Sequence, residues 1–206
     1  MATAPPPPVP TSSASASPDY PVTFDVEYPE SLSRWKIFLK WLFAIPHIII
    51  VYLLSIVAQV LLLIGFFAIL FTKKWPRGLF DFFVQIQRWT NNTFAYAFVL
   101  LRDEYPPFSG DSGAYPLTLE IEYREDLSRW QIFLKWLFAL PHLLILVVLW
   151  IAASFAILFA FFAILFTARY PRGLFDFVVG TMRWTNRVNA YGFWLMTDRY
   201  PPFSLK

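Results

Sequence analysis

The chain has 206 residues, of which 57% are hydrophobic, 20% aromatic and only 15% charged. This balance is unusual for a soluble protein and predicts that lipid surrounds most of the chain. The sequence contains no cysteine, which excludes disulfides, thiolate metal sites and cysteine nucleophiles. The formal net charge of +3 is too small for the basic surface that nucleic-acid binding needs, so we expect no nucleic-acid partner.

The first 19 residues differ in composition from the rest of the chain. They are rich in proline, serine and alanine, and they include an unbroken proline run from Pro5 to Pro8. Such a composition is typical of disordered segments. The segment lacks the basic start and the apolar centre of a secretory signal peptide. We therefore expect residues 1–19 to form a disordered tail.

The remainder of the chain is a tandem duplication. Residues 115–204 repeat residues 20–109 without a gap, and more than half of the aligned positions are identical. The identities form runs, which are RWxIFLKWLFAxPH, FFAILFT, PRGLFDF, RWTN and YPPFS. This pattern divides the chain into unit one (20–109), a short linker GDSGA (110–114) and unit two (115–206). Because the linker is short, we expect the two units to be neighbours in space.

Each unit begins with an alternation of apolar and polar residues, at 22–28 in unit one and at 117–123 in unit two. Strict alternation predicts a strand with one buried face, and we expect the two strands to pair with each other or to lie on the membrane-facing helices. A predicted helix follows, in which Trp35, Phe38, Leu39 and Leu42 share one face. Lys36 and Lys40 lie on the other face. This pattern is typical of a helix in the headgroup layer, which Pro46 and Pro141 should break or kink before the membrane.

Two long uncharged runs follow, at residues 48–71 and 143–166. Each would form a helix of about 36 Å, which exceeds the hydrocarbon thickness of about 30 Å. These runs therefore predict one membrane span in each unit.

The next segments, residues 79–101 and 174–196, leave two topologies open. A polar stripe runs along the first of them, through Asp81, Gln85, Arg88 and Asn92. Such a helix can span only if the stripe faces protein or water. Two spans per unit, four in all, is the favoured prediction and would make the units parallel. One span per unit is the alternative and would invert one unit relative to the other.

The stripes supply one set of candidate functional residues. Asp81 and Arg88, with Asp176 and Arg183 in unit two, would form crossed ion pairs if the units packed about a pseudo-two-fold axis. Three interpretations remain open, namely a structural pair, a solvated helix face and an ion or proton path. The arginines of the RWTN runs would also suit lipid phosphates.

His47 and His142 are a second candidate pair, because they follow proline at equivalent positions near the membrane entry. Two imidazoles brought together by symmetry would suit a metal or haem. Neither has a neighbouring carboxylate or thiolate ligand, so an interfacial histidine without metal is the favoured interpretation. We therefore predict no metal and no cofactor.

The strings LKWLFAxPH, FAILFTxxxPRGLFDF and AYxFxLxxDxYPPFS resemble a family of bacterial membrane proteins catalogued as domain of unknown function 4389. The resemblance covers both units, from Tyr20 to Ser204. It implies a membrane setting and a recurring tandem arrangement, and it implies no catalytic residues.

These observations predict a membrane protein that is mainly α-helical, with a small β element. Each unit should contain a strand, an interfacial helix, a transmembrane helix and an amphipathic helix. No catalytic constellation is present, which favours a non-enzymatic scaffold or accessory subunit that binds lipid, itself or a larger complex. The alternative is a small transporter or channel component that uses the Asp and Arg stripes. The expected location is the cell membrane, as a multi-pass protein of a bacterial inner membrane.

Overall fold

The computed structural model describes residues 20–206, so the predicted disordered tail lies outside the described residues. The chain is mostly helical and has one small sheet, as the sequence predicted. Its elements, in chain order, are β1 (Val22–Val26), α1 (Lys36–Phe43), α2 (Ile45–Thr72), α3 (Arg77–Ala97), β2 (Leu117–Ile121), α4 (Gln131–Thr167) and α5 (Arg172–Gly192).

The two strands pair with each other, as predicted. They run antiparallel, with Val22 opposite Ile121 and Val26 opposite Leu117. Alternate residues are buried on both strands, while Thr118 and Glu120 of β2 are exposed on the other face. The sheet therefore has one apolar face toward the helices and one polar face turned away from them.

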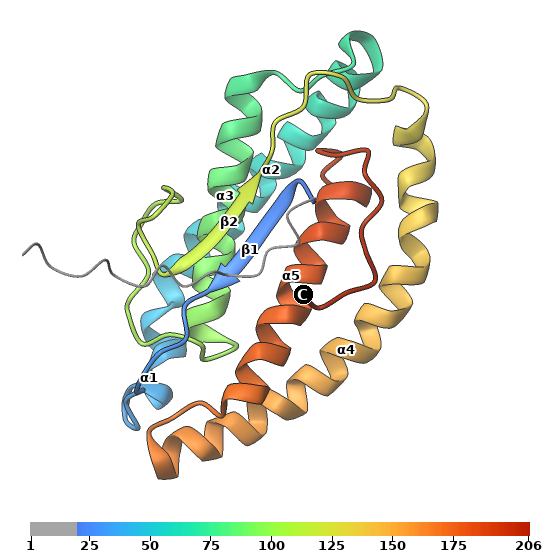
Figure 1. Ribbon diagram of the computed structural model, residues 1–206. Coiled ribbons are helices and arrows are strands. Elements are labelled where there is room, and N and C mark those ends of the chain that lie inside the picture. The colour runs from blue at the N-terminus through green and yellow to red at the C-terminus, as the bar shows by residue number, and fades with distance from the viewer. Residues whose placement is uncertain (1–19) are drawn as a thin grey trace, which may run out of the picture.

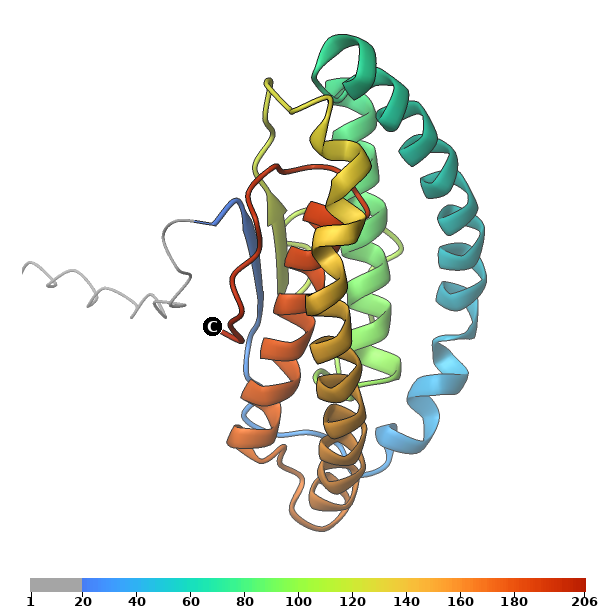
Figure 2. The ribbon, with the colours of Figure 1, turned by 90° about the vertical axis from the view of Figure 1, so that its right-hand side faces the viewer.

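The helices lie on one side of the sheet (Figure 2). The inner helices α3 and α5 pack against the sheet, the outer helix α2 packs against α3, and the outer helix α4 packs against α5. The inner helices are exchanged between the units, because α5 packs under β1 and α3 packs under β2. Neither unit therefore covers its own strand with its own inner helix, and the two units form one core.

The two units run in opposite directions. β1 and β2 are antiparallel, and α2 and α4 also point in opposite directions (Figure 1). Near the centre, the side-chain amides of Asn91 and Asn186 donate to each other's oxygens at 3.3 and 3.1 Å. This reciprocal pair marks a pseudo-two-fold axis that is perpendicular to the strands. Antiparallel units are the relation that the one-span alternative requires.

The proline after the first helix has different effects in the two units. In unit one, α1 ends at Phe43 and Pro46 lies in the first turn of α2, so the predicted break is present. In unit two, α4 continues through Pro141 over 37 residues, so the proline does not break the helix there.

Two of the described helices, α2 and α4, are long and apolar enough to cross a membrane. In their most apolar windows, only 17% and 22% of the residues are buried inside the protein. A core helix of a soluble protein would be mostly buried. The exposure of α2 and α4 therefore supports a membrane setting.

Candidate functional site

The helix α1 buries Lys40 and exposes its aromatic residues. Trp35 is 80% exposed, whereas Lys40 is only 1% exposed. The Lys40 ammonium donates to the Arg102 carbonyl at 2.7 Å and pairs with the Asp103 carboxylate at 2.8 Å. Burial lowers the pKa of Lys40, and the bond to Asp103 opposes that shift. Lys40 therefore lies on the face opposite the apolar residues, and this face is turned into the protein.

Unit two repeats this arrangement at the start of α4. Lys135 is fully buried, and it donates to the Thr197 carbonyl at 2.9 Å and pairs with Asp198 at 2.6 Å. Trp130 is 81% exposed. A buried ammonium is costly unless it is paired, so each lysine fixes its helix to the loop that carries the aspartate.

The proposed histidine pair is held in two separate aromatic clusters. The Trp89 indole donates to Nδ1 of His47 at 2.9 Å. The His47 ring stacks on Phe108 with centroids 4.1 Å apart, and Tyr105 lies against its edge. Since an indole N–H only donates, Nδ1 must carry the lone pair, and the neutral ring keeps its proton on Nε2. Neither nitrogen then offers a free lone pair to a metal.

His142 has the same surroundings in unit two. The Trp184 indole donates to its Nδ1 at 3.0 Å, and its ring stacks on Phe203 at 3.9 Å. Across residues 20–206, no group of three or more potential metal-ligating side chains is found. The structure therefore assigns both histidines to packing inside their own units.

The polar stripes of α3 and α5 face the sheet. Arg88 donates from Nε to the Leu119 carbonyl at 2.7 Å. Arg183 donates to the Phe24 carbonyl at 2.7 Å and pairs with Asp25 at 2.8 Å. These arginines hold each inner helix to the strand above it. Because their guanidinium groups bond the sheet, the structure does not favour the phosphate interpretation.

The crossed ion pairs are not formed. Asp81 pairs with Arg77 at 3.0 Å, and Asp176 pairs with Arg172 at 3.1 Å, each one turn away on its own helix. The reason is geometric, because α3 and α5 are antiparallel about Asn91 and Asn186. Asp81 lies about 15 Å along α3 from this axis, far from the level of Arg183.

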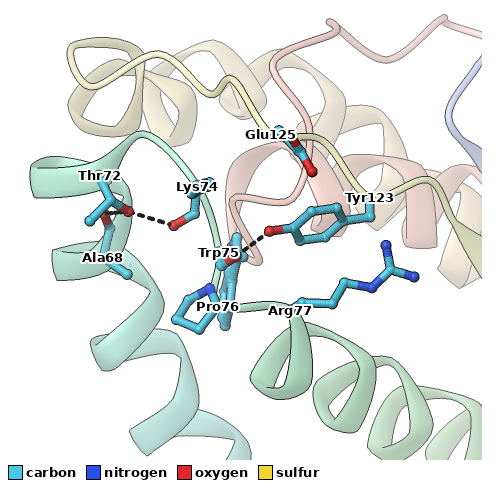
Figure 3. Close-up of a pocket in the computed structure, with 8 residues that line it drawn as sticks. All are labelled: Ala68, Thr72, Lys74, Trp75, Pro76, Arg77, Tyr123 and Glu125. Carbon is cyan, nitrogen blue, oxygen red and sulfur yellow. Dashed lines mark hydrogen bonds between the residues drawn. The ribbon is translucent and has the colours of Figure 1, made fainter.

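Sequence reasoning missed the pocket at the turn between α2 and α3. Figure 3 shows its lining residues, and its volume is about 600 Å³. Unit two forms part of the wall of this pocket of unit one, where the Tyr123 hydroxyl donates to the Trp75 carbonyl. The Arg77 guanidinium lies 4.6 Å from the centre of the Tyr123 ring. Lys74 and Glu125 also line this pocket, so its lining includes charges of both signs.

The largest exposed feature is an apolar surface on α2 and α4, which we call the outer face. Its members recur every three or four residues on each helix, so one stripe of each helix points away from the protein. On α2 they include Ile49, Leu53, Ile56, Val60, Leu63, Phe67 and Phe71. On α4 they include Leu144, Val148, Ile151, Phe155, Phe159, Phe162 and Phe166.

The sequence of both units matches a known protein family. A family described as a domain of unknown function (DUF4389) matches residues 34–110 and 129–204, one copy in each unit. The matched segments cover the helices and the loops after them, and they leave out β1 and β2. No curated protein matches the chain, and neither does any solved structure.

Proposed function

Because the chain belongs to the DUF4389 family in two tandem copies, a family described only as of unknown function, we propose its role from its surfaces. The protein acts as a non-enzymatic membrane scaffold or accessory subunit. The outer face holds it in lipid, and its polar side is available to a second copy or to another membrane protein.

The exposed and buried residues of α1 and of the start of α4 carry this proposal. In water, a helix buries Trp, Phe and Leu and exposes Lys. Here Lys40 and Lys135 are buried, and Trp35 and Trp130 are at least 80% exposed. Exposed tryptophans at the ends of apolar helices are typical of proteins that contact the lipid interface.

The contacts of the charged stripes support a scaffold more than a transporter. Arg88 and Arg183 bond the backbone of the sheet, and Asp81 and Asp176 pair within their own helices. These bonds give every one of the four side chains a structural role. An ion or proton path would need at least some of them to line a continuous polar route.

The location follows from the same argument. We propose a bacterial cell membrane, in keeping with the membrane family that the sequence resembles. The four-span and two-span topologies both remain predictions.

The proposal is tested by purifying the full chain in lipid nanodiscs and weighing the intact particles by native mass spectrometry. We expect a homo-oligomer or a stoichiometric complex with another membrane protein. A monomer that carries no protein partner, together with a solute flux through proteoliposomes that is lost in Arg88→Gln, would contradict the scaffold and favour the transporter.

A further inference from the structure

The outer helices α2 and α4 are displaced along their length. The ring of Phe66 on α2 lies 5.7 Å from that of Phe133, ten positions before the uncharged run of α4. The ring of Phe38 in α1 lies 5.6 Å from that of Phe161, which is near the end of that run. The backbone bond from the Leu32 amide to the Ala168 carbonyl confirms this displacement. Most of each uncharged run therefore lies beside the segment that precedes the other run. Only a short part of it lies beside the other run itself.

The displacement of α2 relative to α4 determines how far the two uncharged runs overlap. Because α2 and α4 are antiparallel and Phe66 is level with Phe133, residue 48 is level with residue 151. The runs 48–71 and 143–166 then overlap over about nine residues, or about 13 Å. Together they extend over about 58 Å along the helices. A hydrocarbon core is about 30 Å thick, so an upright molecule cannot place both runs inside it.

Charge also differs between the two sides of the molecule across its thickness. The outward side of the sheet carries Asp25 and Glu120, while the runs 48–71 and 143–166 on the opposite side carry no charge. The sheet lies against the middle of α3, because Arg88 bonds Leu119 there. An upright molecule would therefore bring Glu120 to the depth of the acyl chains, where an ionised side chain is costly.

From these two observations we propose that the molecule lies flat in one leaflet of the bilayer. The outer face of α2 and α4 contacts acyl chains, α3 and α5 lie at headgroup level, and the polar face of the sheet contacts water. The pseudo-two-fold axis is then parallel to the membrane normal. Both units meet lipid at the same depth, which accounts for the identical RWxIFLKWLFAxPH runs and the matching exposure of Trp35 and Trp130. This orientation rests on the proposed membrane role.

Counting labels per molecule tests the orientation. The chain has no cysteine, so the double variant Arg34→Cys/Lys74→Cys presents one thiol at each end of α2. Both positions are exposed. The variant is reconstituted in sealed vesicles and treated with a membrane-impermeant maleimide, and the intact protein is weighed. A flat molecule has both thiols on the same side, so we expect each molecule to carry either two labels or none.

An upright α2 would instead give one label on every molecule, even if insertion occurred in both directions, and that result would overturn the flat orientation. Arg34→Cys/Arg169→Cys is the matched control, because both thiols lie at the same end of the fold. It should give two labels or none in any orientation, and two on all molecules after detergent is added. Failure of the protein to float with the vesicles would contradict the membrane role itself, whereas one label contradicts only the flat orientation.

Discussion

The outer face of α2 and α4 and the outward face of the sheet lie on opposite sides of the same pair of inner helices. The first is a continuous surface of Leu, Ile, Val and Phe, and the second carries Thr118 and Glu120. Between these two faces, Lys40 and Lys135 are buried with their aspartates. The two faces therefore suit two different solvents, lipid and water. Burial inside the protein does not by itself identify the face that suits water.

The buried lysines should give the largest effect. Lys135→Met leaves Asp198 without its cation, and removing one partner of a buried pair costs about 3 to 5 kcal/mol. We expect a lower midpoint of thermal unfolding in nanodiscs. Lys36→Met is the matched control, because Lys36 is exposed on the equivalent helix, and it should change stability by less than about 0.5 kcal/mol. Equal effects of the two substitutions would contradict the structural role of Lys135.

A charge on the outer face should give the next largest effect. Val148→Asp places a carboxylate where acyl chains are expected, and insertion scales assign about 2.5 to 3.5 kcal/mol to such a residue at mid-membrane. The fraction of protein that floats with vesicles should fall. Thr118→Asp adds the same charge to the polar face of the sheet, and we expect flotation to be unchanged. A protein that tolerates Val148→Asp as well as Thr118→Asp would not have its outer face in lipid.

The fit between α2 and the turn after it should give a smaller effect. A Cβ on Gly65 would lie 2.3 Å from the Trp75 ring. Unit two has Ala160 in place of Gly65 and Tyr170 in place of Trp75. The larger helix residue therefore occurs together with the smaller aromatic ring. Gly65→Ala should destabilise the protein by about 1 to 3 kcal/mol through overpacking. In thermal unfolding, Gly65→Ala/Trp75→Tyr should recover part of this loss, and an additive double variant would contradict the paired fit.

The amides at the pseudo-two-fold axis should give the smallest effect. Asn91→Ala removes the reciprocal bonds with Asn186. A typical hydrogen bond contributes about 0.5 to 1.5 kcal/mol to stability. A double-mutant cycle with Asn186→Ala should show coupling of that size, since the two residues act only on each other across the axis. Zero coupling would mean that the units are held together by the sheet and the apolar contacts alone.

Patterns that depend on local sequence were sufficient to predict several elements. Alternation predicted the two strands and their pairing, and the uncharged runs predicted α2 and most of α4. The resemblance predicted the family in two copies. The helical pattern placed Lys40 opposite Trp35 and Phe38, but such a pattern separates two faces without showing which of them lies inside. Its identity with Lys135, together with the identity of Asp103 and Asp198, was a signal of the buried pairs.

Other features depended on the path of the chain in space. The crossed pairs needed Asp81 and Arg183 at the same level, whereas the antiparallel inner helices hold these two residues apart. The break at Pro46 and its absence at Pro141 depend on a residue far along the chain. In unit two, Gly192 of α5 allows α4 to approach closely, since a Cβ there would lie 2.9 Å from the Ala139 methyl. Unit one has Ala97 at the equivalent position, and the helix is interrupted at Ala44.

In the proposed arrangement, the outer face contacts acyl chains while the sheet contacts water. The most direct measurement places a nitroxide label at Val148→Cys and, in a second variant, at Thr118→Cys. Power saturation in nanodiscs then compares collisions with oxygen, which concentrates in lipid, and with a water-soluble nickel chelate. The label at 148 should be relaxed mainly by oxygen and the label at 118 mainly by nickel. Strong relaxation by nickel at 148, or protection from nickel at 118, would contradict the account.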